Sequence, residues 1–223
     1  MERGRLSVVA TPIGNLEDIT LRALRVFKEV DYILCEDTRV TGKLLSHYEI
    51  KAKLKRYDAH ASDTVHEAII ADLEAGKHIA LVSDAGTPGV SDPGVLLIIR
   101  AREAGIRVDA IPGASALTSA LSISGLTGNE FVFLGFVPQK KGRETFFKAL
   151  SSYEIPVIFY ESPHRIMKTL ESLVVYYPEG DVKIFRELTK MHEEVVAGTS
   201  EEVLQYFKVH EDHVRGEFVV MVG

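Results

Sequence analysis

The chain has little cysteine and no long hydrophobic run. Cys35 is the single cysteine among 223 residues, which excludes a disulfide within the chain and is typical of a reducing compartment. It follows the apolar run 32–34 and is predicted to be a buried strand residue rather than a nucleophile. No apolar run reaches the length of a membrane span, and residues 1–5 lead into a predicted strand instead of a signal peptide. We therefore expect a cytoplasmic protein with no membrane partner.

An excess of positive charge is also missing. The formal net charge is −6, which argues against a protein that coats nucleic acid without specificity. Local charge differs from this average, because residues 51–56 carry four positive charges and residues 140–143 carry three. Either stretch could contact phosphates, but solvated surface is the usual meaning of such runs. Composition leaves the choice open.

Several common catalytic signatures are absent. The first predicted strand is not followed by GxGxxG, and neither GxxxxGK[ST] nor GxSxG occurs. The eight histidines show no HExxH or other zinc spacing, so we expect no metal site. The segment 192–194, His-Glu-Glu, is predicted to be an exposed turn. These absences weaken dinucleotide, nucleotide-hydrolysis and serine-hydrolase functions.

The segment 81–94, LVSDAGTPGVSDPG, is the most informative part of what is present. The buried strand predicted at 78–82 runs into an acidic residue and then into a loop rich in glycine and proline. We expect Ser91 or Asp92 to cap a helix with Pro93 in its first turn. A strand, a glycine loop and a helix start in this order are typical of a ligand site at the carboxyl edge of an α/β sheet. The alternative is a tight surface crossover.

Strands and helices alternate along the chain and predict an α/β fold with two domains, 1–112 and 113–223. The first domain is expected to hold a mostly parallel five-stranded sheet and the second a mixed sheet, closely packed with a cleft between them. The predicted strands are 5–10, 31–35, 53–57, 78–82, 107–111, 131–134, 157–160, 182–187 and 217–222. The predicted helices begin near Asp18 or Thr20, at Arg39, at Ser62 or Asp63, at Pro93 and near 112–116, with two more at 143–150 and 164–175.

Five polar clusters follow predicted strands. They lie at 11–14 (TPIG), 36–39 (EDTR), 83–84 with the glycine loop, 112–115 (PGAS) and 160–165 (YESPHR). Each alone has a structural explanation, since Asp37 and Thr38 could cap a helix and Arg39 could pair with Glu36. Together they predict a polar cleft and favour a small-molecule enzyme over a scaffold.

In their order, the motifs TPIGNLEDIT, EDTR, SDAGTPGVSDPG, PGASALTSAL, GFVP, YESPHR and RELTKMHEEVVAGT resemble the tetrapyrrole methylase superfamily, the class III S-adenosylmethionine-dependent methyltransferases. EDTR, SDAGTPG and YESPHR resemble its branch that methylates ribosomal RNA. The resemblance covers nearly the whole chain. It implies a homodimer that transfers a methyl group from S-adenosylmethionine to the ribose 2′-oxygen of a cytidine in the decoding region of 16S rRNA.

The resemblance also implies where the cofactor binds, in the cleft between the two domains. Asp84 would hydrogen-bond a polar group of the cofactor, and Tyr160 would close the pocket. The other residues implied to approach it are small or offer backbone groups: Pro12, Ile13, Gly14, Gly86, Thr87, Ser115 and Ala116.

Methyl transfer to a hydroxyl requires a group that accepts its proton. Asp37 is the first candidate, because EDTR ends a strand that faces the predicted cleft, and Glu36, His164 and Glu187 are the others. Arg39 is placed beside this chemistry and, with Arg165, Arg186 and Lys190, among the groups that could hold phosphates. For Arg165 and Arg186 the alternative is a salt bridge between domains.

Two other functions remain open at this stage. One is methylation of a tetrapyrrole or another small molecule, which would need an apolar wall for a macrocycle. The other is nucleic-acid binding without catalysis, which predicts no selective cofactor binding. If 16S rRNA or the small subunit is the partner, the acidic net charge predicts weak affinity for naked RNA and a steep dependence on salt.

Overall fold

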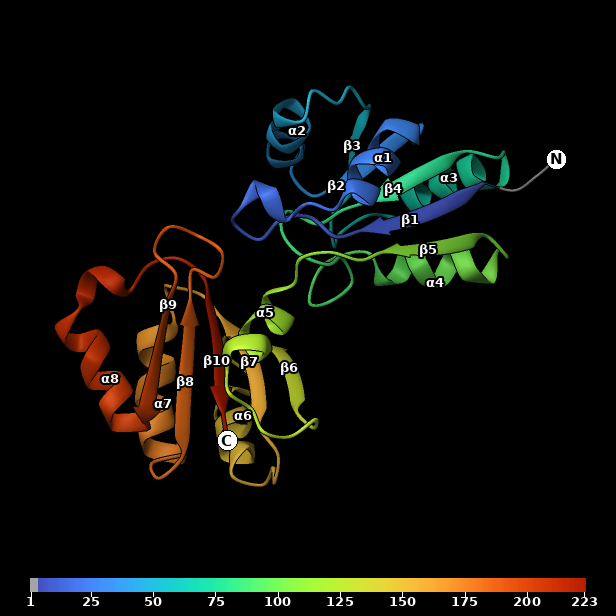
Figure 1. Ribbon diagram of the computed structural model, residues 1–223. Helices are drawn as coiled ribbons and strands as arrows, with labels where there is room; N and C mark the ends of the chain where they lie inside the picture. The colour runs from blue at the N-terminus through green and yellow to red at the C-terminus, as the bar shows by residue number, and fades with distance from the viewer. Residues whose placement is uncertain (1–3) are drawn as a thin grey trace. The chain divides into compact units, whose positions relative to one another are not determined.

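The computed structural model describes residues 4–223 and consists of two compact units, one through Ser115 and one from Ala116 to Gly223. Each unit contains one five-stranded sheet with helices on its faces (Figure 1). The α/β prediction is confirmed. No helix within residues 4–223 is long and apolar enough to cross a membrane.

The first unit holds an all-parallel sheet in the order β3-β2-β4-β1-β5. Parallel strands put their carboxyl ends on one edge, so the loops after them share that edge. The strands are β1 Arg5–Val9, β2 Tyr32–Cys35, β3 Leu54–Arg56, β4 His78–Leu81 and β5 Arg107–Ile111, and the helices are η1 Leu16–Asp18, α1 Leu21–Glu29, α2 Thr38–His47, α3 Asp63–Glu74 and α4 Val95–Glu103.

This unit has one hydrophobic core on each face of its sheet, and alternate residues of β2 point into the two cores. Ile33 and Cys35 join α1 and α2 in a cluster on one face, whereas Tyr32 and Leu34 join α3 and α4 on the other. Cys35 is fully buried, as predicted. Strands buried on both faces read as unbroken apolar runs, which is the pattern the sequence shows.

Side-chain caps fix where most helices of this unit begin. The Thr20 hydroxyl accepts the amide of Ala23 at the start of α1, and Ser62 does the same for Val65 at α3. The predicted start of α4 is wrong. Its N-cap is Gly94 at φ 126°, with Pro93 outside the helix, because Asp92 turns its carboxylate toward Ser83 instead of capping.

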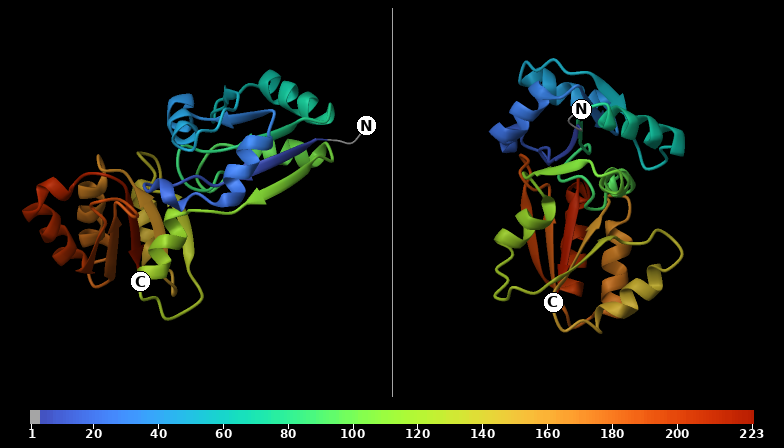
Figure 2. Two further views of the ribbon diagram at one scale, coloured as in Figure 1. Left: turned by 45° about the horizontal axis from the view of Figure 1, so that its top comes forward. Right: turned by 90° about the vertical axis from the view of Figure 1, so that its right-hand side faces the viewer.

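The second unit holds a mixed sheet in the order β6-β7-β10-β8-β9, in which only β6 and β7 are parallel. Helices α6, α7 and α8 cover one face and α5 packs on the other against β10 (Figure 2). The strands are β6 Val132–Phe136, β7 Val157–Glu161, β8 Asp181–Arg186, β9 Glu194–Thr199 and β10 Phe218–Val222, and the helices are α5 Ala116–Ile123, α6 Arg143–Leu150, α7 Ile166–Tyr176, α8 Ser200–Val209 and η2 Glu211–His213.

The sequence patterns did not predict the strand β9 or the helix α8 of this unit. β9 is an edge strand whose burial alternates residue by residue, and its sequence EVVAGT contains small residues that carry little strand signal. α8 carries a capping box in which Thr199 and Glu202 cap each other's backbone amides. That spacing was available in the sequence and identifies the helix start.

Candidate functional site

The loops after β1, β4 and β5 are joined at the carboxyl edge of the first sheet. Thr11 and Gly86 exchange backbone hydrogen bonds of 2.9 and 3.0 Å as an antiparallel bridge. The Thr11 hydroxyl donates to the carbonyl of Ser83 (3.3 Å), and the Thr87 hydroxyl donates to the carbonyl of Ala114 (3.2 Å). Three of the predicted polar clusters therefore form one connected surface.

Gly86 supplies a left-handed backbone conformation where these loops meet. Its φ of 83° is left-handed, and a Cβ built there would lie 3.5 Å from Cγ2 of Ile13. The sequence-predicted residues Ile13, Gly86 and Thr87 thus lie together. Ile13 is buried, whereas Pro12 is half-buried and Gly14 is exposed.

Asp84 connects this surface to the cluster after β2. Its Oδ1 accepts the backbone amide of Asp37 at 3.0 Å. Asp37 is the N-cap of α2, and its carboxylate also binds the guanidinium of Arg39, with an Nη2–Oδ2 distance of 2.6 Å. Asp37 thus caps a helix, as the structural explanation of EDTR proposed, and Arg39 pairs with Asp37 rather than with Glu36.

Three carboxyl groups near this edge differ in proton affinity. Hydrogen bonds from the Arg39 side chain and backbone lower the pKa of Asp37 to about 2. Burial, together with the charges of Asp84 and Asp92, raises the pKa of Glu36. Burial raises the pKa of Asp92 to about 6, although the Ser83 hydroxyl opposes this. Asp92 was not foreseen as a titrating group, because only the fold returns it to β4.

Tyr160 links β7 to the start of α5 in the second unit. Its hydroxyl accepts the backbone amide of Leu117 at 3.1 Å, the residue after Ala116. Its ring contacts Phe133 and Phe136 edge to face, with centroids 4.9 and 5.4 Å apart. Tyr160 and Ala116, two of the predicted cofactor residues, are therefore neighbours within this unit.

Glu161 is a fully buried carboxylate that the sequence offered only as part of YESPHR. Its oxygens lie 2.8 Å from Nη2 of Arg165 and 3.5 Å from Nη1 of Arg143, and it accepts the Thr169 hydroxyl at 2.6 Å. Arg165 also donates to the carbonyl of Val137. Arg165 is thus paired with Glu161 within the second unit. His164 is exposed in the turn beside it.

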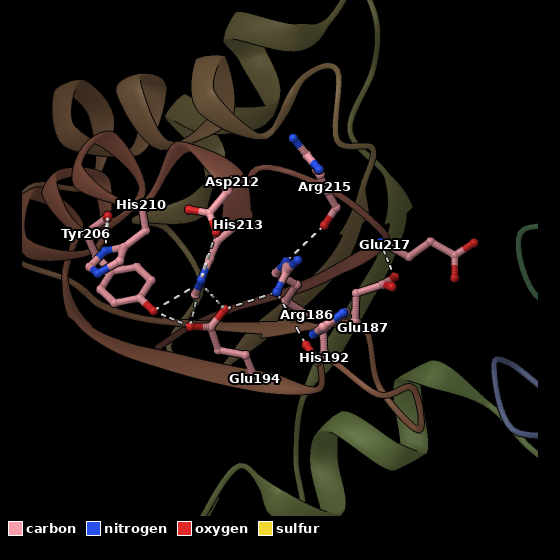
Figure 3. A network of polar contacts seen from close by, with 10 residues as sticks. All are labelled: Arg186, Glu187, His192, Glu194, Tyr206, His210, Asp212, His213, Arg215 and Glu217. Carbon is pink, nitrogen blue, oxygen red and sulfur yellow. Dashed lines mark hydrogen bonds and ion pairs between the residues drawn. The ribbon is translucent and has the colours of Figure 1, made fainter.

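Arg186 lies in a second polar network (Figure 3). The buried guanidinium donates to the carbonyls of Arg215 (2.9 Å) and His192 (3.3 Å) and pairs with Glu194 at 3.4 Å. Glu194 also accepts the Tyr206 hydroxyl. These partners of Arg186 all belong to the second unit.

Lys190 and Glu187 pair with each other in the turn after β8. Nζ of Lys190 lies 2.7 Å from Glu187 and 2.9 Å from Glu217. Burial would raise the pKa of Glu187, but the hydrogen bond from Lys190 and the backbone amide of Glu217 lower it. Arg165, Arg186 and Lys190 are therefore bound to partners of the protein itself. Within residues 4–223 no three histidine, cysteine or acidic side chains are grouped to hold a metal ion.

Comparison with known proteins places this architecture in a class. Residues 5–204 match the family described as Tetrapyrrole (Corrin/Porphyrin) Methylases. Among solved structures, the uroporphyrin-III C-methyltransferase of Thermus thermophilus complexed with S-adenyl homocysteine has a similar fold, with a TM-score of 0.65 and 20% identity over 99% of this chain and 97% of that one. The class is that of the tetrapyrrole methylases.

Closer relatives define the branch. The protein from Halalkalibacterium halodurans named ribosomal RNA small subunit methyltransferase I is 47% identical over 99% of this chain and 76% of its own length. The protein of the same name from Thermotoga maritima is 44% identical over 92% of each chain. This chain therefore belongs to the ribosomal RNA small subunit methyltransferase I family of the tetrapyrrole methylases.

Proposed function

We propose that this chain transfers the methyl group of S-adenosylmethionine to the ribose 2′-oxygen of a cytidine in the decoding region of 16S rRNA. The observation that carries the proposal is the match to relatives named ribosomal RNA small subunit methyltransferase I over nearly the whole chain. The choice of ribose and cytidine rests on the resemblance of EDTR and YESPHR to that branch. No observation favours a macrocyclic substrate.

The joined loops of the first unit fit a cofactor that is held mainly by backbone groups. Gly86 carries no side chain, so a small molecule can approach the surface of these loops closely, while the amide and carbonyl of Gly86 are bonded to Thr11. A protein of the same fold was crystallised with S-adenyl homocysteine, which supports the choice of cofactor. The residues we assign to it are Pro12, Ile13, Gly14, Asp84, Gly86, Thr87 and Ser115 in the first unit, and Ala116 and Tyr160 in the second. Its place in a cleft between the units stays a prediction.

S-adenosylmethionine supplies an electrophilic methyl group on a sulfonium. The protein has to orient the ribose hydroxyl, exclude water and accept the hydroxyl proton. Asp37 is poorly suited to the last task, since Arg39 keeps its pKa near 2. Glu36 lies beside it, half-buried and with a raised pKa, so we place Glu36 ahead of Asp37 as the proton acceptor. Arg39 then orients Asp37, and Arg165, Arg186 and Lys190 position the loops of the second unit.

Paired amide substitutions test this order. Glu36→Gln is expected to lower kcat about 100-fold or more, because general-base catalysis contributes on that scale, with unchanged affinity for S-adenosylmethionine by calorimetry. Asp37→Asn keeps the capping oxygen and is expected to change kcat by less than about 10-fold. A Glu36→Gln enzyme that retains full kcat would remove Glu36 from the mechanism. A selective loss in Asp37→Asn would restore the original assignment.

Mass spectrometry of 16S rRNA tests the proposed function as a whole. In a strain without this gene, we expect one ribose-methylated cytidine to be lost and to return when the chain is supplied on a plasmid. Unchanged rRNA in the deletion strain contradicts the proposal. Loss of a base methyl group instead of a ribose methyl group contradicts the choice of atom but keeps the RNA substrate.

Two further statements about the molecule stay predictions. The resemblance to the family implies a homodimer, which light scattering of the purified protein measures directly. The cytoplasmic location is supported by relatives named ribosomal RNA methyltransferases, and fractionation of cells tests it.

A further inference from the structure

An exposed aromatic ring ends one strand of the second unit, and two exposed lysines lie in the loop that follows it. Phe136 ends β6 with half of its surface exposed (50%), and the loop 137–142 that follows carries Lys140 and Lys141, both exposed. The Phe136 ring is steadied edge to face by Tyr160 at 5.4 Å. In the ion pairs found among residues 4–223, neither lysine takes part. We call Phe136, Lys140 and Lys141 the β6-loop surface.

The protein fixes the base of this loop. Nη1 of Arg165 donates to the carbonyl of Val137 at 2.8 Å, and Nη1 of Arg143 reaches the carbonyl of Pro138 at 3.5 Å. Glu161 holds both guanidinium groups from within the core. A loop anchored at its start loses less conformational freedom when it binds a partner, which favours a binding role over that of a mobile tip.

The local charge of this region is opposite to that of the whole chain. Arg143 and Arg165 outweigh Glu161 by one positive charge, and the two lysines add two more. Glu144, the nearest acidic residue along the chain, is already paired with Lys148 at 2.6 Å. A protein of net charge −6 needs such a localised basic surface to meet a polyanion.

The other basic stretch is less suited to this role. In residues 51–56, Lys55 pairs with Asp72 and lies 3.6 Å from the ring centroid of Tyr32, and Arg56 pairs with Asp58. Only Lys51 and Lys53 are exposed there without such a partner among the described ion pairs. They serve as a matched pair of charges for comparison.

From these observations we infer that the β6-loop surface binds single-stranded RNA next to the methylated nucleotide, with a base stacked on Phe136 and flanking phosphates on Lys140 and Lys141. Unstacked bases on aromatic side chains and phosphates on lysines are the usual elements of such recognition. The inference rests on the proposed function and adds to it the surface that holds the substrate.

The charge part is tested with two double variants, K140A/K141A and K51A/K53A, which remove equal charge from different places. For K140A/K141A we expect the slope of log Kd for small subunits against log salt to fall by about 1.4, as for two lost single-strand phosphate contacts. K51A/K53A should leave the slope unchanged. Equal effects of the two variants would overturn the inference, because only net charge would then matter.

The stacking part is tested at Phe136. Phe136→Leu is expected to raise KM for small subunits about 10-fold, and Phe136→Tyr is expected to restore it, since stacking requires a π face. Affinity for S-adenosylmethionine and the thermal midpoint are measured for each variant, and Phe136→Tyr guards against a variant that fails to fold. Equal KM values for Leu and Tyr would overturn the stacking. Failure of the wild type to methylate small subunits would instead contradict the proposed function.

Discussion

Asp92 shows how the fold changes the chemistry of a single residue. In the sequence it reads as a helix cap beside Pro93, a role in which its side-chain oxygen would accept a backbone amide of the first turn. In the structure burial and the charge of Asp84 raise its pKa to about 6, against the opposing hydrogen bond from Ser83. A group with a raised acid pKa opposes folding once it ionises.

Asp92→Asn is therefore expected to stabilise the protein at neutral pH. The folded carboxyl binds protons more tightly than the unfolded one, so the wild type loses stability as pH rises from about 4 to about 6. After allowance for partial solvent screening, we expect a gain of about 1–2 kcal/mol at pH 7.5 that disappears at pH 4. Urea unfolding at the two pH values measures it. A gain of equal size at both would show that ionisation is not the cause.

The proton affinities of Glu36 and Asp37 could not be predicted from the sequence. EDTR places two carboxylates after β2, but it does not reveal which of them keeps a usable proton affinity. That depends on Arg39 folding back onto Asp37 two residues earlier, with Nε within 3.0 Å of its Oδ1. Such rotamer choices depend on the local geometry and leave no pattern in the sequence.

At the scale of elements, β2 and β4 were predictable because their residues are mostly apolar and buried. The start of α4 was not predictable. At Gly94 a Cβ would lie 2.7 Å from Cδ2 of Leu81, so glycine is required by a close approach of the helix to β4. The cap preference of Ser91 and Asp92 is weaker than this packing constraint. The carboxylate of Asp92 consequently faces Ser83 and does not cap α4.

The contacts of Glu161 make it the joint between β7, α6 and α7. We expect Glu161→Gln to lower the free energy of unfolding by about 3 kcal/mol, because two guanidinium groups would lose the buried anion that pairs with both, while the Thr169 bond remains possible. Chemical denaturation measures this. As a control, Lys148→Gln removes an exposed pair with Glu144 and should leave the midpoint unchanged. A loss no larger than that of the control would contradict the role of Glu161.

At the scale of the whole molecule, each unit is built around its own hydrophobic residues. Leu73 belongs to a core between α3 and the first sheet, and Leu170 to the core under α6, α7 and α8. The alternating pattern of strands and helices predicted two such halves. It did not predict β9 and α8, so the second half was expected to contain fewer elements than it does.

Separate cores predict separate responses to cavities. Leu73→Ala and Leu170→Ala should each cost about 2–5 kcal/mol, since both side chains are fully buried. We expect faster amide hydrogen exchange in the strands of the altered unit and unchanged exchange in the other. Exchange mass spectrometry resolves the two by peptide. Acceleration of both units by either variant would mean that they unfold together.

The position of β10 has a consequence for the synthesis of this protein. Phe218–Val222 lies between β7 and β8 in the middle of the second sheet, although it comes after both in the chain. A nascent chain on the ribosome can form the first sheet as soon as β5 emerges, whereas β7 and β8 must wait with open edges until β10 leaves the exit tunnel. Chains broken off shortly before Phe218 would keep those edges open and be prone to aggregate. The emergence of β10 is thus the step that allows the sheet of the second unit, which holds Tyr160, to close.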